Sequence, residues 1–136
     1  MLKLSDFNLD KFINEEYFDT LPELYDLKEV IEYNIWHENE SVFDHSLEVI
    51  YKFKEILSKL NDSLLNYLGE KVTYYSRKDI LFLSILLHDI AKKDTFKIND
   101  EGITSCPNHE LEGAIKSENI LDRFDLSSKE KIWLKL

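Results

Sequence analysis

Three histidine-bearing positions are the candidates for chemistry in this chain: His45, the pair His88-Asp89, and His109. The chain has only four histidines in 136 residues. Imidazole nitrogens and carboxylate oxygens are the ligands that zinc, iron, manganese and nickel sites share. The pair His88-Asp89 follows a strongly apolar stretch, and a carboxylate there needs a partner because an unpaired buried charge is costly. A divalent cation is one such partner.

Each candidate also has a simpler interpretation. A lone histidine such as His45, next to a helix-capping residue, is usually a surface or hydrogen-bonded side chain. His88 and Asp89 could form a hydrogen-bonded pair, and since helix neighbours point about 100° apart, both reach one ion only beside the end of the helix. Cys106 and His109 have the spacing of half a zinc knuckle, but a structural zinc site needs four ligands and the chain has no second cysteine.

Other charged residues near these positions have competing interpretations as well. Lys92 and Lys93 follow the His-Asp pair and could meet a phosphate group, but they are equally favourable as cations at a helix C-terminus. His37 lies in a polar segment that we predict to be a loop, which makes it a positional or substrate-facing residue. Glu38 and Glu40, in the same segment, are most simply a solvated face.

The composition indicates a single helical domain, residues 1–136, long enough to bury one core. Hydrophobic residues make up 43% and charged residues 32%, which is ordinary for a globular protein. With three glycines and two prolines, a hairpin-rich β fold is unfavourable and helices are favoured. The lone cysteine, Cys106, excludes an internal disulfide, and no signal peptide is recognisable, so we expect a cytoplasmic protein.

The charge of the chain restricts its partners. A net charge of −10 repels a phosphate backbone, so we expect no broad nucleic-acid-binding surface. A small phosphate-bearing substrate, a nucleotide among them, stays compatible with this charge if a cationic metal centre holds it. The longest apolar run, residues 80–87, is too short to span a bilayer, so no membrane partner is expected.

The apolar pattern predicts the elements that position the first histidine. A lead-in over residues 1–36 has mixed three- and four-residue spacings, which predicts one or two short helices interrupted near Pro22. The next helix should begin at Ser41 or Asp44. Its predicted inner face consists of Leu47, Ile50, Tyr51, the stem of Lys54, and Leu57.

The clearest helix precedes the His-Asp pair. A shorter helix is predicted over residues 61–69, and the next begins at Ser76, where Asp79 completes a Ser-x-x-Asp capping pattern. The following residues are apolar nearly all round, which is typical of the buried central helix of a bundle. Such a helix delivers His88 and Asp89 at its interior end.

The remaining chain predicts one hairpin and two helices. Residues 95–98 and 103–106 flank a turn and form the only strand signal that we recognise. Asn108 is expected to cap a helix over residues 109–122. A last helix begins at a second capping box, Ser127 with Glu130, and ends among apolar side chains at residues 132–136. Because these side chains demand burial, we expect a chain that stops inside a helix, or a homo-oligomer formed through this helix.

Together, these motifs resemble the HD-domain superfamily of metal-dependent phosphohydrolases over residue 35 to the C-terminus. His37-Glu38 followed by residues 41–47 is similar to the family's first-histidine segment. Residues 86–92 are similar to its Leu-His-Asp-Ile-Gly-Lys motif, and residues 108–114 to its Gly-His-Glu-x-x-Gly-Ala segment. With a hairpin between the last two motifs, the chain most resembles the HD module of bacterial tRNA nucleotidyltransferases and related stand-alone proteins.

The resemblance implies an all-α HD-domain helical bundle with one small β-hairpin. It also implies a divalent metal ion (Mn, Ni, Fe, Zn or Mg) held by His45, His88 and Asp89. The implied activity is metal-assisted hydrolysis of a phosphomonoester or phosphodiester that is related to a nucleotide. Asp89, Lys92 and His109 are the candidate catalytic residues: Asp89 orients the attacking water, while Lys92 or His109 stabilises charge on the phosphoryl oxygens.

The chain departs from the family at the fourth ligand, an aspartate on a later helix. Asp122 and Asp125 do not match it, because both lie too close to His109 in the sequence. The motif-bearing core, residues 37–136, is therefore expected to be cut short at its C-terminus. The alternative function is a catalytically incomplete HD module that binds a nucleotide, a metal or a protein partner. The nucleotidyltransferase catalytic head is absent, so nucleotide addition to tRNA is not expected.

Overall fold

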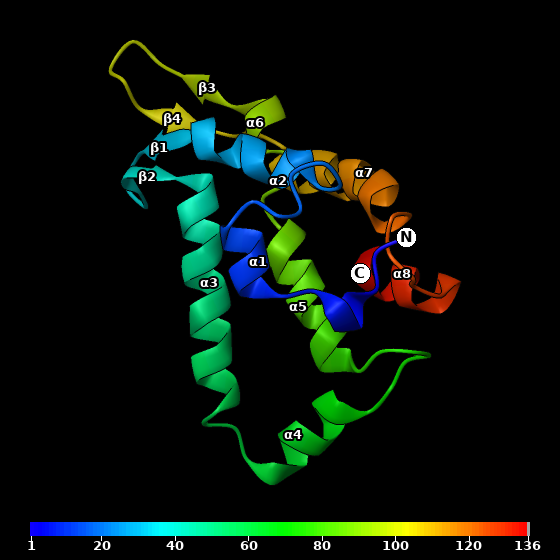
Figure 1. Cartoon of the computed structure of the whole chain (residues 1–136). Coiled ribbons are helices and arrows are strands. Elements are labelled where there is room, and N and C mark those ends of the chain that lie inside the picture. The colour runs from blue at the N-terminus through cyan, green and yellow to red at the C-terminus, as the bar shows by residue number, and fades with distance from the viewer. Residues whose placement is uncertain (136) are drawn as a thin grey trace.

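The computed structural model describes residues 1–135 as a helical protein with two short pairs of antiparallel strands (Figure 1). In chain order the elements are η1 Leu4–Asp6, α1 Leu9–Ile13, α2 Pro22–Asp26, η2 Leu27–Glu29, β1 Ile31–Tyr33, β2 Glu38–Ser41, α3 Val42–Leu57, α4 Asp62–Gly69, α5 Arg77–Leu87, α6 Lys92–Thr95, β3 Lys97–Ile98, β4 Thr104–Ser105, α7 His109–Leu121 and α8 Ser128–Lys135. The predicted helical class is confirmed.

Helix α5 is the centre of the fold, as the sequence predicts. Ser76 Oγ accepts a hydrogen bond from Asp79 N at 3.2 Å, and Ser76 N donates to the Asp79 carboxylate at 3.4 Å, which completes the expected capping box. The helix packs against α3, α4 and α8. Its buried side chains are Ile80, Leu83, Leu86 and Leu87. Since α5 is held on several sides, the residues that follow Leu87 are delivered to a fixed place.

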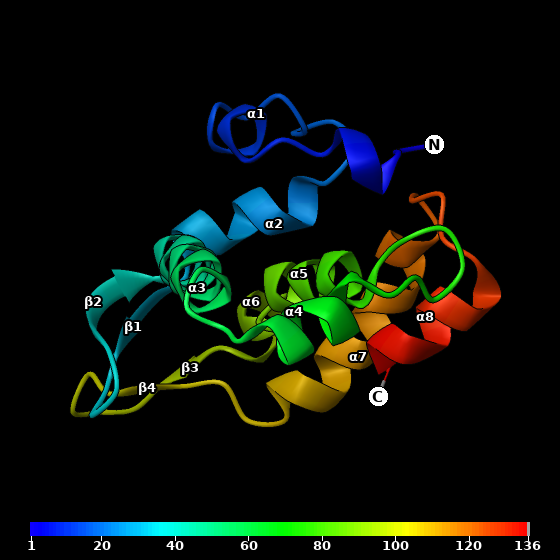
Figure 2. The same cartoon turned by 90° about the horizontal axis from the view of Figure 1, so that it is seen from below.

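The N-terminal segment belongs to the same core. Figure 2 shows α1 and α2 on one side of the layer that contains α3, α5 and α7. Pro22 does not interrupt a helix but begins α2, where its missing N–H costs nothing. Leu2 N donates to Arg123 O at 2.7 Å, which ties the N-terminus to the end of α7. The buried side chains of this segment include Phe12, Leu21, Leu24 and Leu27.

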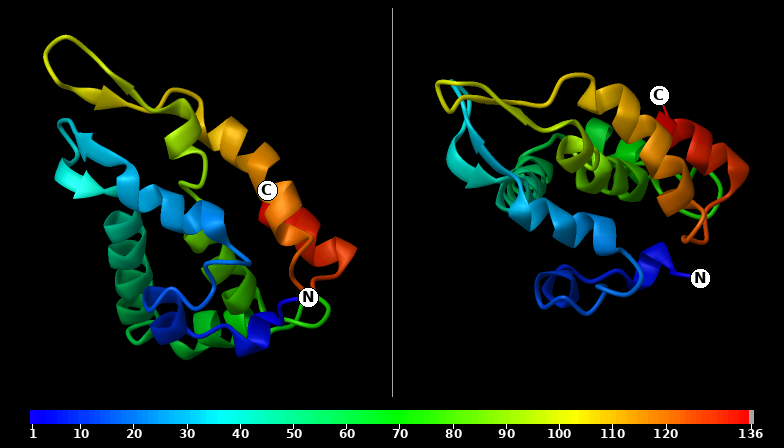
Figure 3. Two further views of the ribbon diagram at one scale, coloured as in Figure 1. Left: turned by 45° about the horizontal axis from the view of Figure 1, so that its top comes forward. Right: turned by 90° about the horizontal axis from the view of Figure 1, so that it is seen from above.

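Two β-hairpins lie side by side at one end of the molecule (Figure 3). The pair β3–β4 is at the predicted place, with Ile98 opposite Thr104. The pair β1–β2 was not predicted: residues 38–41 form a strand where we predicted a loop, while His37 itself lies in the turn between the two strands. Its strand β1 buries the charged Glu32, which is 4% exposed, while the flanking Ile31 and Tyr33 are exposed. In a half-buried strand the apolar side chains usually face the core and the polar ones face the solvent. Because β1 has the opposite arrangement, its sequence does not show the pattern that identifies a strand.

The structure decides between the two predicted caps of α3 and corrects two other predictions about helices. Ser41, rather than Asp44, caps α3: its Oγ accepts from Asp44 N at 3.0 Å. The predicted inner face is wrong beyond Ile50, since Tyr51 is 52% exposed and none of residues 51–57 is buried. Asn108 precedes α7 as predicted but does not cap it through its side chain, because it adopts a left-handed conformation with φ 62°.

The C-terminal helix leaves apolar surface exposed. Ile132 is exposed, Leu134 packs against the core, and the predicted apolar end at Leu136 lies outside the described residues. Self-association through α8 and the division into a lead-in and a core stay predictions. Within residues 1–135, no helix combines the length and the apolar character that crossing a bilayer requires.

A buried carboxylate fixes the loop before α5. Glu130 is fully buried, and its carboxylate accepts hydrogen bonds from Ser127 N at 2.9 Å, Tyr74 N at 3.0 Å and Tyr75 N at 2.7 Å. It therefore completes the predicted Ser127–Glu130 capping box and also joins α8 to the loop between α4 and α5. Burial raises the pKa of Glu130, but these donors outweigh it and hold the pKa below its usual value.

We expect Glu130→Ala to lower the free energy of unfolding by about 2–4 kcal/mol, because three backbone donors lose a charged acceptor. Urea denaturation of the purified variant measures this loss. Glu101→Ala is the matched control, since Glu101 is exposed in the β3–β4 turn. Equal unfolding midpoints for the two variants would contradict this account of Glu130.

Candidate metal centre

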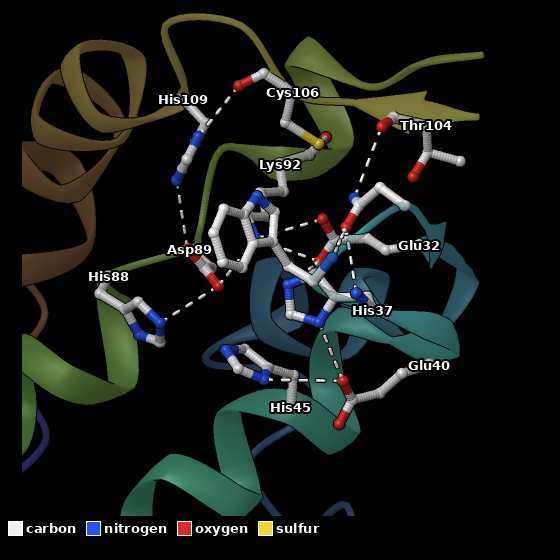
Figure 4. Close-up of polar contacts among 12 residues, drawn as sticks. Glu32, His37, Glu40, His45, His88, Asp89, Lys92, Thr104, Cys106 and His109 are labelled. Atoms are coloured by element: carbon white, nitrogen blue, oxygen red, sulfur yellow. Dashed lines mark hydrogen bonds and ion pairs between the residues drawn. The ribbon is translucent and has the colours of Figure 1, made fainter. Parts of the chain in front are cut away.

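The predicted site residues come together where three helical elements meet the hairpins (Figure 4). His45 lies in the first turn of α3, and His109 is the first residue of α7. His88 and Asp89 lie in the turn that follows α5. Because this turn lies beyond the last helical residue, both side chains converge: His88 Nε2 is 3.1 Å from Asp89 Oδ2.

Asp89 is the centre of this cluster and is 3% exposed. Its Oδ2 lies 3.1 Å from His88 Nε2 and 3.2 Å from Lys92 Nζ, and its Oδ1 lies 3.3 Å from His109 Nε2. Although these nitrogens lie at ion-pair distance, Oδ2 is buried without a hydrogen bond of acceptable geometry. A buried carboxylate oxygen in this condition has a lone pair available for a cation.

The donor set fits a divalent metal ion. His45, His88 and Asp89 each offer one ligand atom, and these atoms all lie within 4.8 Å of one another. His88 Nδ1 lies 2.5 Å from the carbonyl oxygen of Ile85, so Nδ1 carries a proton, and Nε2, which faces Asp89 Oδ2, is the nitrogen that can bind an ion once it has released its own proton. A histidine that donates its second N–H to a backbone carbonyl is the usual arrangement of a metal-ligating imidazole.

The charges around Asp89 favour its ionised form. Burial raises the pKa of Asp89, but the close contact with His88 and the ammonium of Lys92 outweigh burial and hold the pKa at about 2. Burial lowers the pKa of His88, yet contact with Asp89 raises it above the usual value. Burial lowers the pKa of His45, which keeps that ring neutral and able to bind a metal at neutral pH.

The structure excludes one of the two interpretations of Lys92. Helix α5 ends at Leu87, so Lys92 is not a cation at its C-terminus but opens α6, and it is buried. Its Nζ lies 3.0 Å from Glu32 Oε1 and 3.2 Å from Asp89 Oδ2. Burial lowers the pKa of Lys92, but the two carboxylates raise it more, so the ammonium stays charged. Lys93 is exposed and pairs with Glu29 at 3.1 Å.

The β1–β2 hairpin adds residues that sequence reasoning missed. Glu40 is not part of a solvated face: its Oε2 lies 3.0 Å from His37 Nδ1 and 3.7 Å from His45 Nδ1. His37, Glu40 and His45 form a second group with ligand atoms within 4.8 Å of one another. Glu32 is the other missed residue, and the only signal for it was a carboxylate inside the apolar segment 30–33.

One ring nitrogen of His109, Nδ1, is fixed as a hydrogen-bond donor. Its Nδ1 lies 2.9 Å from the carbonyl oxygen of Cys106, which can only accept, so Nδ1 carries a proton. The remaining nitrogen, Nε2, faces Asp89 Oδ1. The contact with Cys106 therefore fixes the orientation of the ring and directs Nε2 into the cluster.

The two later aspartates do not reach this cluster. Asp122 pairs with Lys131 at 2.8 Å, and Asp125 accepts hydrogen bonds from Leu4 N at 3.0 Å and from the Tyr75 hydroxyl. The possible metal-binding groups of residues 1–135 include neither of them. Neither aspartate is therefore placed to supply the family's fourth ligand.

Comparison with known proteins connects this arrangement to one family. Residues 42–134 match the family model described as HD domain. The match covers His45, His88, Asp89 and His109, and it begins after His37. No curated protein and no solved structure matches the chain significantly. The likeness to the HD module of tRNA nucleotidyltransferases stays a prediction.

We expect the affinity for Zn²⁺ or Mn²⁺ to fall at least tenfold between about pH 8 and about pH 5.5, because His88 must lose its proton to bind the ion and its pKa is raised. Isothermal titration calorimetry at several pH values measures this change. His88→Ala should bind more weakly throughout and with a flatter pH profile. Tight binding of equal strength across the range would show that His88 is not a ligand.

Proposed function

The chain belongs to the HD-domain family, and we propose that it is a metal-dependent phosphohydrolase acting on a phosphomonoester or phosphodiester of a nucleotide. The observation that carries this proposal is the convergence of His45 and His88 on Asp89, whose buried Oδ2 lacks a hydrogen-bond partner. In the HD-domain family, a histidine and a His-Asp pair are expected to hold the catalytic ion, and these residues match that pattern.

His45, His88 and Asp89 would hold the ion. Their mixture of imidazole and carboxylate ligands suits Mn, Ni, Fe or Zn and is compatible with Mg. When bound, a divalent ion supplies polarisation of a phosphoryl oxygen and a water molecule acidic enough to attack near neutral pH. His37 and Glu40 approach from the other side of His45, so a second ion or an extra ligand on this side is part of the proposal.

The residues of the chain then have distinct roles. Asp89, ionised at physiological pH, orients the attacking water through the carboxylate. Lys92 keeps positive charge beside Asp89 and stabilises negative charge that develops on the phosphoryl group. His109 presents Nε2 beside Asp89 Oδ1, where it can give a proton to the leaving oxygen.

We expect Asp89→Asn to abolish hydrolysis of a generic phosphodiester and of a 2′,3′-cyclic nucleotide, assayed with added Mn²⁺ or Ni²⁺, while the circular dichroism spectrum is unchanged. The amide keeps the size of the side chain but loses the anionic ligand. Asp94→Asn is the matched control, because Asp94 is exposed and pairs with Lys116. Turnover retained in the purified Asp89→Asn protein would contradict the proposed role of Asp89 in hydrolysis.

We expect His109→Ala to lower kcat by about 10²- to 10⁴-fold, the usual size of a general acid contribution, and to change metal affinity by less than about threefold. Steady-state kinetics and calorimetry on the same preparation separate these effects. Glu112→Gln, an exposed change on the same helix, is the control. A large loss of metal affinity would instead make His109 a ligand. Metal binding without turnover in the wild-type protein would favour the alternative, a non-catalytic HD module.

A further inference from the structure

A cavity of about 350 Å³ lies between the two hairpins and opens beside the metal centre. We call it the hairpin cavity. Lys92 and His109 line its inner part, and both contact Asp89. Trp36 and Ile103 line its outer part. The cavity therefore joins the charged groups of the site to an aromatic surface, and its volume lies within the range of small-molecule sites.

The side chain of Trp36 stands in a fixed turn. Asn34 Oδ1 accepts hydrogen bonds from Trp36 N at 2.8 Å and from His37 N at 3.0 Å, which holds the backbone between β1 and β2. Trp36 is nevertheless 80% exposed. It also borders a second hollow of about 450 Å³ on the outer surface of the same turn. A large aromatic ring on a restrained backbone, open to solvent, can bind a flat ligand with little ordering cost.

The opposite wall of the cavity is tied to this turn. Tyr33 N donates to Thr104 Oγ1 at 2.8 Å, and the Asn34 side-chain amide donates to Thr104 O at 3.4 Å. Thr104 itself is buried, and the neighbouring Ile103 faces the cavity. The two hairpins are thus joined by hydrogen bonds beside the cavity that Trp36 and Ile103 line.

Resting on the proposed function, we infer that the hairpin cavity binds the base of a nucleotide substrate, with Trp36 as the stacking surface. The substrate must have an anionic end for the metal centre and a flat, apolar end for Trp36 and Ile103. A nucleotide has both. Stacking on one aromatic side chain strengthens the binding of a base by about tenfold or more, and it tolerates different bases because each has a π face.

Fluorescence tests this inference without any turnover. The chain has two tryptophans, and Trp133 lies in α8 near Arg77, away from the cavity. In a Trp133→Phe protein, the signal comes from Trp36 alone. We expect adenosine 5′-monophosphate to quench this emission in a saturable way, whereas ribose 5-phosphate, which lacks only the base, leaves it unchanged.

Equal quenching by adenosine 5′-monophosphate and ribose 5-phosphate, or no quenching by the nucleotide, would contradict the base site even if hydrolysis is found. Quenching without hydrolysis in any variant would support the base site while the proposed reaction fails, so the two failures are distinguishable. Where turnover is measurable, Trp36→Ala should lower the selectivity for adenosine 5′-monophosphate over ribose 5-phosphate by about tenfold, and Trp36→Phe should restore most of it.

Ile98→Ala is the matched control for that kinetic test. Ile98 is exposed on β3 of the neighbouring hairpin and does not line the hairpin cavity. Its substitution removes apolar surface of the same region without touching the inferred stacking surface. The same loss of selectivity in Ile98→Ala and Trp36→Ala would contradict the assignment of Trp36.

Discussion

The burial of the Asp89 carboxylate is the constraint on which the rest of the structure depends. A charged carboxylate removed from water is stable only with positive or hydrogen-bonding partners around it. Here His88, Lys92 and His109 supply those partners from the turn after α5 and from the starts of α6 and α7. The same requirement makes the cluster suitable for a divalent cation, because one carboxylate oxygen still lacks a hydrogen bond.

The charge of Asp89 also connects the hairpins to the helices. Lys92 bridges Asp89 and Glu32, and Glu32 is the buried residue of β1. The hairpin is thereby held against the site, and the turn that carries Trp36 is held with it. Asp89, Lys92 and Glu32 therefore connect the metal centre to the hairpin whose turn carries the inferred base-binding surface.

The sequence was sufficient for the elements whose signals are local. The Ser76–Asp79 capping box and the apolar run after it predicted α5, and the three family motifs predicted which side chains meet at its end. It was insufficient where partners are far apart in the chain. Glu32 pairs with Lys92 across 60 positions, and a buried glutamate between exposed Ile31 and Tyr33 concealed β1. Since β2 is polar along most of its length, neither strand had the alternation that identifies a half-buried strand.

Elemental analysis of the purified protein, beside a His45→Ala variant prepared in the same way, tests the central claim most directly. We predict about one transition-metal ion per chain in the wild-type protein, because three converging ligands with a fixed histidine tautomer bind such ions tightly. The variant should hold substantially less. A wild-type protein that stays metal-free after incubation with Mn²⁺, Ni²⁺ or Zn²⁺, or a variant with an undiminished metal content, would contradict the account.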